Sequence, residues 1–264
     1  MYNFKYHKVN TIQEASNLLI SCDDPKILAG GHTLIPTLKQ RLSQPSDIID
    51  ISMIKDLNKI DLEDNKIIIG ALCTHNDIAS SIDVLSNIDS LSKLAQQIGD
   101  PQVRHRGTIG GSIANADPAA DYPAAVIALD AKIYTSKSIY NADDFFVEMF
   151  ETAISPDEII QKIEFRIPTA STYRKFRNPA SGYAMAGVFI AKFDDIVRVA
   201  ITGASSVVFR LKDLEDALSN NFTTSVLDNI TIDSSDFNDD IHASSKYRGN
   251  LVKVLIEEAI SDLI

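Results

Sequence analysis

The stretch Ile27-Leu28-Ala29-Gly30-Gly31-His32-Thr33-Leu34-Ile35-Pro36 decides how the first part of this chain folds. An apolar run typical of a buried strand ends at two adjacent glycines, and a segment typical of a helix follows at once. Thr33 is in position to cap that helix, and Pro36 falls in its first turn, where proline is tolerated. Because glycine allows close approach of the backbone, the pattern predicts a strand–turn–helix unit that faces a second backbone or a ligand.

A second glycine pair lies in the stretch "RGTIGGSIANADPAADYPA", residues 106–124. The backbone amides at a helix start lack intrahelical partners, and the helix dipole there favours negative charge. Two such loops therefore predict a bound phosphate group. Neither G-x-G-x-x-G nor G-x-x-x-x-G-K-[ST] occurs, which argues against a Rossmann turn and a P-loop. For one motif alone, a glycine bend that merely lets strand and helix meet closely has equal weight.

Two carboxylates follow the second glycine pair. We expect Asp117, before Pro118, to cap the following helix, and we expect Asp121 to accept hydrogen bonds from ligand hydroxyls. Two phosphate-facing loops, a hydroxyl acceptor and apolar flanks together describe a dinucleotide with a flat hydrophobic end. FAD is such a molecule.

The bulk composition restricts the class of protein. The chain has 264 residues, of which 45% are hydrophobic and 23% charged, as expected of a soluble globular protein. A net charge of −11 argues against binding to nucleic acid or to an anionic membrane, and no apolar run reaches the length of a membrane span. Cys22 and Cys73 form no disulfide framework or cluster ligand set, and the five histidines show no ligand spacing. These features favour a cytoplasmic protein without metal ligands of its own.

Hydrophobic periodicity and turn residues predict the order of the elements. We expect strands at 2–9, 26–30 and 47–51, a hairpin that turns at Asp64-Asn65, strands at 131–135 and 158–167, and long strands at 183–193 and 196–209 separated by Asp194-Asp195. We expect a helix that begins at Thr33, and helices at 11–21, 74–81, 90–98, 118–129, 211–219, 223–229 and 244–262. Changes in this pattern place boundaries near residues 53 and 172.

The segments "AGGHTLIPTLK" (29–39) and "DPQVRHRGTIGGSIANADPAADYPAAVIALDA" (100–131) closely resemble the two FAD-binding motifs of the flavoprotein subunits of molybdenum hydroxylases. That family includes the medium chain of carbon monoxide dehydrogenase and the FAD subunits of xanthine and nicotinate dehydrogenases. The resemblance continues through "SPDEIIQKIEFRIP" and "FRNPASGYAMAGVFIA" to the C-terminal segment. It implies an α+β chain: a PCMH-type FAD-binding fold of two α/β subdomains, 1–53 and 54–172, followed by a C-terminal domain, 173–264, with an antiparallel sheet and helices.

The resemblance also implies the residues that contact the cofactor. Residues 29–36 would wrap the pyrophosphate, residues 108–112 would face it, and Lys175 would lie near the flavin unless it is an ordinary exposed lysine. The implied set is Ala29, Gly30, Gly31, His32, Thr33, Leu34, Ile35, Pro36, Gly99, Thr108, Ile109, Gly110, Gly111, Ser112, Asp121, Ile160 and Lys175. This chain departs from the family pattern at Ser112, where Asn is common, and at Gly182, which is often Arg. Tyr183 either shields the flavin or is a buried strand tyrosine, and we favour the second interpretation.

The function implied by the resemblance is electron transfer within a complex. FAD, bound non-covalently, would receive electrons from two [2Fe–2S] clusters on a small subunit, after oxidation of the substrate at a molybdopterin centre on a large subunit. The resemblance implies a dimer of such heterotrimers, with no catalytic residue and no metal on this chain. The alternative is a stand-alone PCMH-type flavin oxidase with FAD covalently attached at His32. The substrate and the electron acceptor of the complex are not indicated by these residues.

Overall fold

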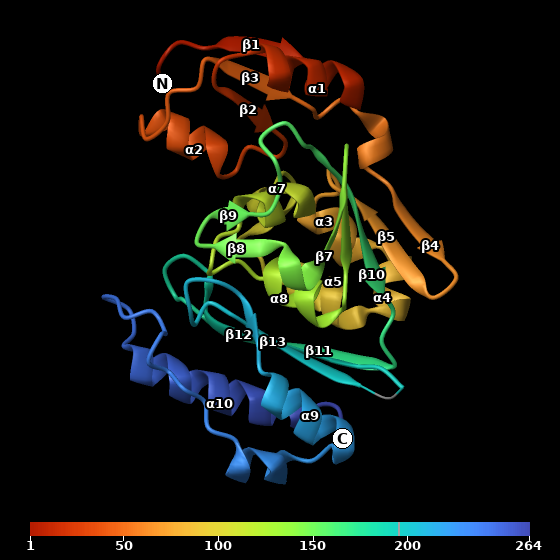
Figure 1. Ribbon diagram of the computed structural model, residues 1–264, viewed down its shortest axis with the longest axis vertical. Helices are drawn as coiled ribbons and strands as arrows, with labels where there is room; N and C mark the ends of the chain where they lie inside the picture. Colours follow the sequence, from red (N-terminus) through yellow and green to blue (C-terminus); the bar gives the residue numbers. More distant parts are fainter. Residues whose placement is uncertain (195) are drawn as a thin grey trace.

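The computed structural model describes residues 1–194 and 196–264, which form three main β-sheets and a two-stranded ribbon. Each main sheet is built from a consecutive stretch of the chain, so the colours in Figure 1 separate into an N-terminal unit, a middle unit and a C-terminal unit. The turn expected at Asp194-Asp195 lies partly outside the described residues. Among the described helices, none is both long enough and apolar enough to cross a membrane.

The N-terminal unit is a three-stranded parallel sheet with two helices, in agreement with the predicted strand–helix–strand–helix–strand order. Its elements are β1 (Lys5–Lys8), α1 (Ile12–Ser21), β2 (Pro25–Leu28), α2 (Leu34–Lys39) and β3 (Asp47–Asp50), and the strand order is β1-β3-β2. The Thr11 hydroxyl caps α1 by accepting a hydrogen bond from the Glu14 amide. Thr33 precedes α2, but its own backbone is helical and its side chain makes no capping hydrogen bond, so the predicted cap is wrong.

The middle unit is a five-stranded antiparallel sheet with several helices, of which α8 is buried along its whole length. Its strands are β4 (Ile60–Glu63), β5 (Lys66–Gly70), β6 (Lys132–Thr135), β7 (Ile139–Asn141) and β10 (Ile160–Arg166), in the order β4-β5-β10-β6-β7. Its helices are α3 (His75–Ser80), α4 (Ile82–Asn87), α5 (Asp89–Gln96), α6 (Pro101–Arg104), α7 (Ile109–Asn115) and α8 (Tyr122–Ala128), with short 3-10 turns at Lys55–Leu57 and Ala142–Asp144 and the ribbon β8 (Phe146–Glu148) and β9 (Glu151–Thr152). The predicted hairpin at Asp64-Asn65 is confirmed.

The predicted helix at 118–129 begins four residues late. Asp117 accepts a hydrogen bond from the Ala120 amide through its carbonyl and from the Ala119 amide through its carboxylate. These bonds form a tight turn before α8 starts at Tyr122, so Asp117 stabilises the turn and does not cap the helix. The structure also contains α4, α6 and α7, which the periodicity did not predict.

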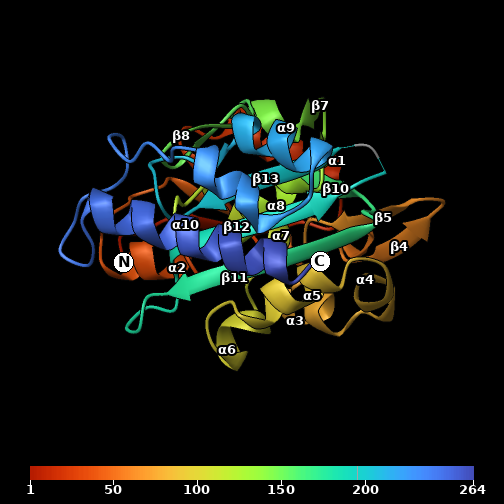
Figure 2. The same cartoon turned by 90° about the horizontal axis from the view of Figure 1, so that it is seen from below.

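The C-terminal unit is a four-stranded antiparallel sheet covered by two helices on one face. Its elements are β11 (Ala170–Arg177), β12 (Ala184–Lys192), β13 (Val197–Thr202), β14 (Phe209–Arg210), α9 (Lys212–Asn220), a 3-10 segment at Thr224–Asn229 and α10 (Ser245–Ser261). Figure 2 shows α9 and α10 lying across this sheet. Phe189 and Ala191 of β12 join the core of the middle unit, whereas Val188 and Ile190 pack with α9 and α10. Because β12 is buried on both faces, its sequence is a continuous apolar run.

Candidate functional site

A cavity of about 780 Å³ lies between the N-terminal and middle units and is lined by both glycine loops. Most of the residues that the resemblance implies for the cofactor line it: Ala29, Gly30, Gly31, His32, Thr33, Leu34, Gly99, Thr108, Gly110, Gly111, Ser112, Asp121 and Ile160. Four of the implied residues, Ile35, Pro36, Ile109 and Lys175, are not part of the lining. The fold thus brings together two loops that are far apart in the sequence.

The glycines of both loops line the cavity and are also packed tightly against neighbouring backbone of the chain. A methyl carbon placed on Gly30 would lie 2.0 Å from the carbonyl oxygen of Arg106, and one on Gly110 would lie 2.6 Å from the carbonyl oxygen of Ala71. Neither position therefore has room for a Cβ atom. Gly31 adopts a positive φ of 77°, which glycine reaches without strain. The first loop is pressed directly onto the second, and this contact is one physical reason for the glycines.

The two loops differ in the amides that they offer. Among the described residues, the backbone N–H groups of residues 30–33 have no hydrogen-bond acceptor within the chain. In the second loop, Ile109 donates to Cys73 at 3.1 Å, Gly110 donates to Ala71 at 2.9 Å and Gly111 donates to the Thr108 hydroxyl at 3.1 Å. The expectation of two free amide cradles is therefore wrong for the second loop. Only the first loop presents a run of unpaired donors suited to an anion.

Asp121 lies at the cavity in a buried polar cluster. Both of its carboxylate oxygens are 2.9 Å from the ammonium nitrogen of Lys175, and one of them accepts a 2.5 Å hydrogen bond from the Tyr173 hydroxyl. The side chain of Lys175 is only 1% exposed, so it is not the ordinary surface lysine of the alternative reading. Burial raises the pKa of Asp121, and the nearby Lys175 ammonium opposes that rise. Lys175 therefore does not line the cavity itself, but it is paired with Asp121, which does.

His75 lines the cavity next to a second buried aromatic residue. The His75 and Tyr122 rings lie with their centroids 5.4 Å apart. The Nδ1 atom of His75 and the hydroxyl of Tyr122 have no hydrogen-bond partner among the described residues. Burial lowers the pKa of His75 to about 4, so the imidazole is neutral at pH 7. His75 lines the cavity, so its unpartnered Nδ1 is an atom to which a bound ligand or an ordered water would supply a hydrogen bond.

Sequence reasoning missed several cavity residues. Tyr183 is 45% exposed and lines the cavity, so the favoured interpretation of a buried strand tyrosine is wrong. Asp117 and Asn115 also line it, within the second glycine stretch, and burial raises the pKa of Asp117. Both residues belong to "ANADP" (114–118), directly after the second glycine pair, and this position could have indicated that they line the cavity. His75, by contrast, has no neighbouring motif that would single it out.

The residues present fit a flavin dinucleotide. The free amides of residues 30–33 are suited to a diphosphate, while the apolar side chains of Ile51, Leu72, Ile159 and Ile160 supply a hydrophobic wall. The cavity volume lies within the usual range for cofactor sites. Fold and site together define an α+β protein that binds a dinucleotide with an apolar ring system.

Comparison with known proteins identifies the family. The family model described as the FAD binding domain in molybdopterin dehydrogenase matches residues 2–170. The chain is 35% identical to the glyceraldehyde dehydrogenase medium chain of Sulfolobus acidocaldarius over 98% of both chains. It is 36% identical to the carbon monoxide dehydrogenase medium chain of Hydrogenophaga pseudoflava over 78% of this chain and 77% of the relative. A solved structure of carbon monoxide dehydrogenase from the same organism aligns with a TM-score of 0.88 at 30% identity, covering 98% of this chain and 96% of that one.

The chain therefore belongs to the FAD-binding family of the molybdopterin dehydrogenases. It is an oxidoreductase subunit with the α+β FAD-binding fold of that family, and its cofactor is FAD. The resemblance stated from the two glycine motifs is confirmed.

Proposed function

We propose that this chain is the electron-transfer flavoprotein subunit of a molybdenum hydroxylase, in which FAD receives electrons from [2Fe–2S] clusters on a partner subunit and passes them to an external acceptor. The observation that carries the proposal is the single cavity in which the free amides of residues 30–33 meet the second glycine loop. The relatives support it, because they are named as medium chains of dehydrogenases.

The residues of the chain would bind and orient the cofactor rather than react. When bound, FAD supplies the redox chemistry of the subunit. The amides of residues 30–33 would donate hydrogen bonds to its diphosphate, each worth about 1.5–3 kcal/mol because the acceptor is charged. The neutral His75 adds no cationic charge to the cavity wall, and the half-exposed ring of Tyr183 is placed to cover an aromatic ligand. Lys175 would balance the charge of Asp121 in the wall.

Membership of this family also suggests which subunits the chain assembles with. We propose a small subunit that carries the iron–sulfur clusters, a large subunit that carries molybdopterin, and a dimer of such heterotrimers in the cytoplasm. The free cysteines Cys22 and Cys73 agree with a reducing compartment. We further propose that the three units, 1–53, 54–172 and 173–264, are its structural domains. A complex purified through a tag on this chain should contain FAD, molybdenum, iron and acid-labile sulfide, whereas a chain that purifies without iron would contradict the assembly.

A flavin titration of the isolated chain tests the binding claim. Because FMN lacks the second phosphate and the adenosine, we expect FAD to bind one per chain and at least about tenfold more tightly, a difference that one charge-assisted hydrogen bond is sufficient to produce. Quenching of flavin fluorescence measures both affinities. Equal affinity for FAD and FMN would show that the diphosphate is not recognised, and would contradict the proposal.

Acid precipitation separates the proposal from a covalent oxidase. His32 lies at the exposed side of the first loop, with its Nε2 atom 3.3 Å from the carbonyl oxygen of Gln102. We expect all flavin to remain in the supernatant after precipitation, as for a non-covalent cofactor. Flavin in the pellet that disappears in a His32→Ala variant would favour the covalent oxidase.

A further inference from the structure

A second cluster of potential ligand atoms lies in the N-terminal unit, apart from the FAD cavity. It consists of His7 on β1, Cys22 directly after α1 and Asp47 at the start of β3. None of the three lines the cavity. The cluster is separate from the residues assigned to FAD, and the inference does not depend on the proposed function.

The fold brings these residues together although they are distant in the sequence. β1 and β3 are parallel, and Lys5 pairs with Asp47 while His7 pairs with Ile49. Since residues two apart lie on the same face of a sheet, His7 and Asp47 are diagonal neighbours on one face. α1 packs on that face through Ala15 and Leu19 against Ile49 and ends at Cys22. The cluster therefore sits where the end of the helix meets the sheet.

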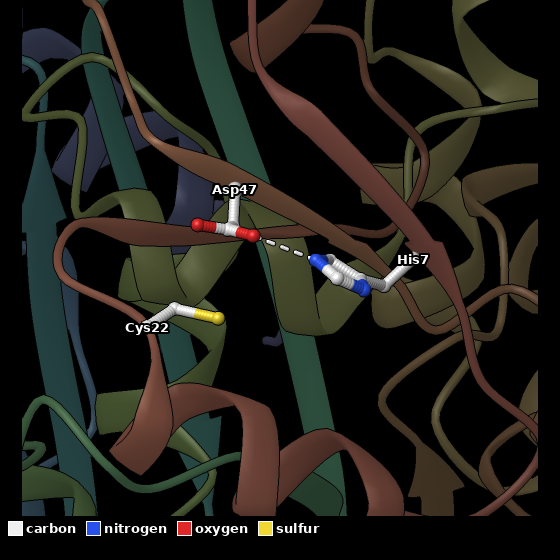
Figure 3. A group of neighbouring side chains, drawn as sticks. All are labelled: His7, Cys22 and Asp47. Carbon is white, nitrogen blue, oxygen red and sulfur yellow. Dashed lines mark hydrogen bonds and ion pairs between the residues drawn. The ribbon is translucent and has the colours of Figure 1, made fainter.

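The three ligand atoms converge on one point. The imidazole Nε2 of His7 is 2.6 Å from a carboxylate oxygen of Asp47, and all three ligand atoms lie within 4.8 Å of one another. Figure 3 shows the His7 ring directed toward the Asp47 carboxylate, with the Cys22 sulfur pointing into the space beside them. Asp47 is buried, whereas His7 and Cys22 are half-buried, so the cluster is held firmly on one side and remains open to solvent on the other.

The combination of donors matches one class of metal ion. Imidazole nitrogen, cysteine sulfur and carboxylate oxygen are the three ligand types that Zn²⁺ uses, and three protein ligands leave the fourth tetrahedral position for water. Zinc–ligand bonds of about 2.0–2.3 Å imply ligand atoms roughly 3.3–3.7 Å apart in a tetrahedron. A bound ion would therefore lengthen the distance between the His7 Nε2 and the Asp47 oxygen, now 2.6 Å, by roughly one ångström or less. It would also bring the Cys22 sulfur closer to both atoms.

We propose that His7, Cys22 and Asp47 form a binding site for a zinc-class divalent ion that links the end of α1 to β1 and β3. On binding, the Cys22 thiol loses its proton to solvent, and the thiolate sulfur bonds to the metal. No electron is transferred. The hydrogen bond that the His7 Nε2–H donates to Asp47 is exchanged for two metal–ligand bonds. The Nε2 proton passes to solvent and Nδ1 carries the remaining ring proton, so that His7 binds the ion as the neutral Nδ1–H tautomer. The ion stabilises the N-terminal unit because the ligands come from three separate elements.

Metal titration of the untagged, chelator-treated full chain tests the site. Co²⁺ is the spectroscopic probe, because a thiolate ligand produces a near-ultraviolet charge-transfer band, and calorimetry with Zn²⁺ gives stoichiometry and affinity. We expect one ion per chain, a thiolate–cobalt band, and a rise in the thermal midpoint on addition of Zn²⁺. Cys22→Ser should abolish the band, and His7→Gln should weaken Zn²⁺ binding by at least about tenfold, the loss seen even for residues that only support a ligand.

Matched variants distinguish a built site from general surface binding. Cys73→Ala removes the other cysteine and His242→Ala removes an exposed histidine, and both should bind Zn²⁺ as the wild-type chain does. Circular dichroism checks that Cys22→Ser and His7→Gln remain folded. Absence of the thiolate band in the wild-type chain would overturn the proposal. So would a band that persists in Cys22→Ser, or affinity that is unchanged in His7→Gln.

Discussion

Asp121 and Lys175 form an ion pair that is almost completely removed from solvent, with the Tyr173 hydroxyl as a third member. Replacement of one partner leaves the other charge buried without compensation, which typically costs about 3–5 kcal/mol. We therefore expect Lys175→Met to lower the free energy of unfolding by this amount. The double variant Asp121→Asn/Lys175→Met removes both charges and should recover part of the loss. Urea denaturation of the apo chain measures both, and a double variant no more stable than Lys175→Met would contradict the pairing.

His75 makes the stability of the chain depend on pH. Its pKa is lowered from 6.5 to about 4 by burial, so the unfolded chain binds a proton in this interval that the folded chain does not. The stability contributed by the neutral imidazole is complete above pH 6.5 and is lost as the pH falls toward 4. Between pH 7 and pH 5 the loss from this group is about 2 kcal/mol.

A His75→Asn variant isolates this contribution. Its free energy of unfolding should fall less between pH 7 and pH 5 than that of the wild-type chain, by about 2 kcal/mol. Chemical denaturation at the two pH values gives the comparison, and carboxylate titrations common to both chains cancel in the difference. Identical pH dependence of the two chains would show that His75 is accessible to protons in the folded state.

At the residue scale, the sequence predicted which residues lie in close backbone contact, but it did not predict which residues they contact. The two glycine pairs predicted close backbone approach, and Gly30 indeed lies against Arg106. The partner could not be predicted, because the contact exists only after two units separated by some seventy residues have packed. For the same reason the sequence could not indicate that Ala71 and Cys73 accept the amides of the second loop.

At the scale of elements, the start of α7 provides a matched pair of substitutions. A Cβ atom on Gly110 would lie 2.6 Å from the Ala71 backbone, whereas one on Gly111 meets only the Thr108 hydroxyl, at 3.0 Å. Gly110→Ala should therefore lower the free energy of unfolding by at least about 2 kcal/mol, as overpacking against rigid backbone does. Gly111→Ala should stay within about 1 kcal/mol of the wild-type chain. Thermal and urea denaturation provide the measurement, and equal effects at both positions would contradict the packing described.

The elements themselves were mostly predictable, since long periodic segments such as α10 and the continuous apolar run of β12 carry a strong local signal. Errors occurred where the expected local interaction was replaced by a different one. Thr33 has the residue type of a helix cap, but its backbone is already helical in the cavity loop. The start of α8 was misplaced because Asp117 forms its own turn with Ala119. The His7–Asp47 contact depends on parallel strand register, which composition does not encode.

At the scale of the whole molecule, the cofactor should hold two units together. Most of the cavity lining comes from the N-terminal unit, through residues 26–51, and from the middle unit, through residues 71–160, and residues 181–183 of the C-terminal unit complete it, so FAD would contact the first two units directly. Ligand at one hundred times its dissociation constant adds about 2.7 kcal/mol of stability. We expect FAD to raise the thermal midpoint and to slow amide hydrogen exchange at residues 29–34. A rise in the midpoint with no added protection in that loop would argue for binding elsewhere.

The most direct test of the central claim is a crystal structure of the chain with FAD bound. The account predicts that diphosphate oxygens lie within hydrogen-bonding distance, about 3 Å, of amide nitrogens of residues 30–33, with the second loop contributing side chains rather than the amides of residues 109–111. A diphosphate that lies away from the first loop, with those four amides facing water, would contradict it.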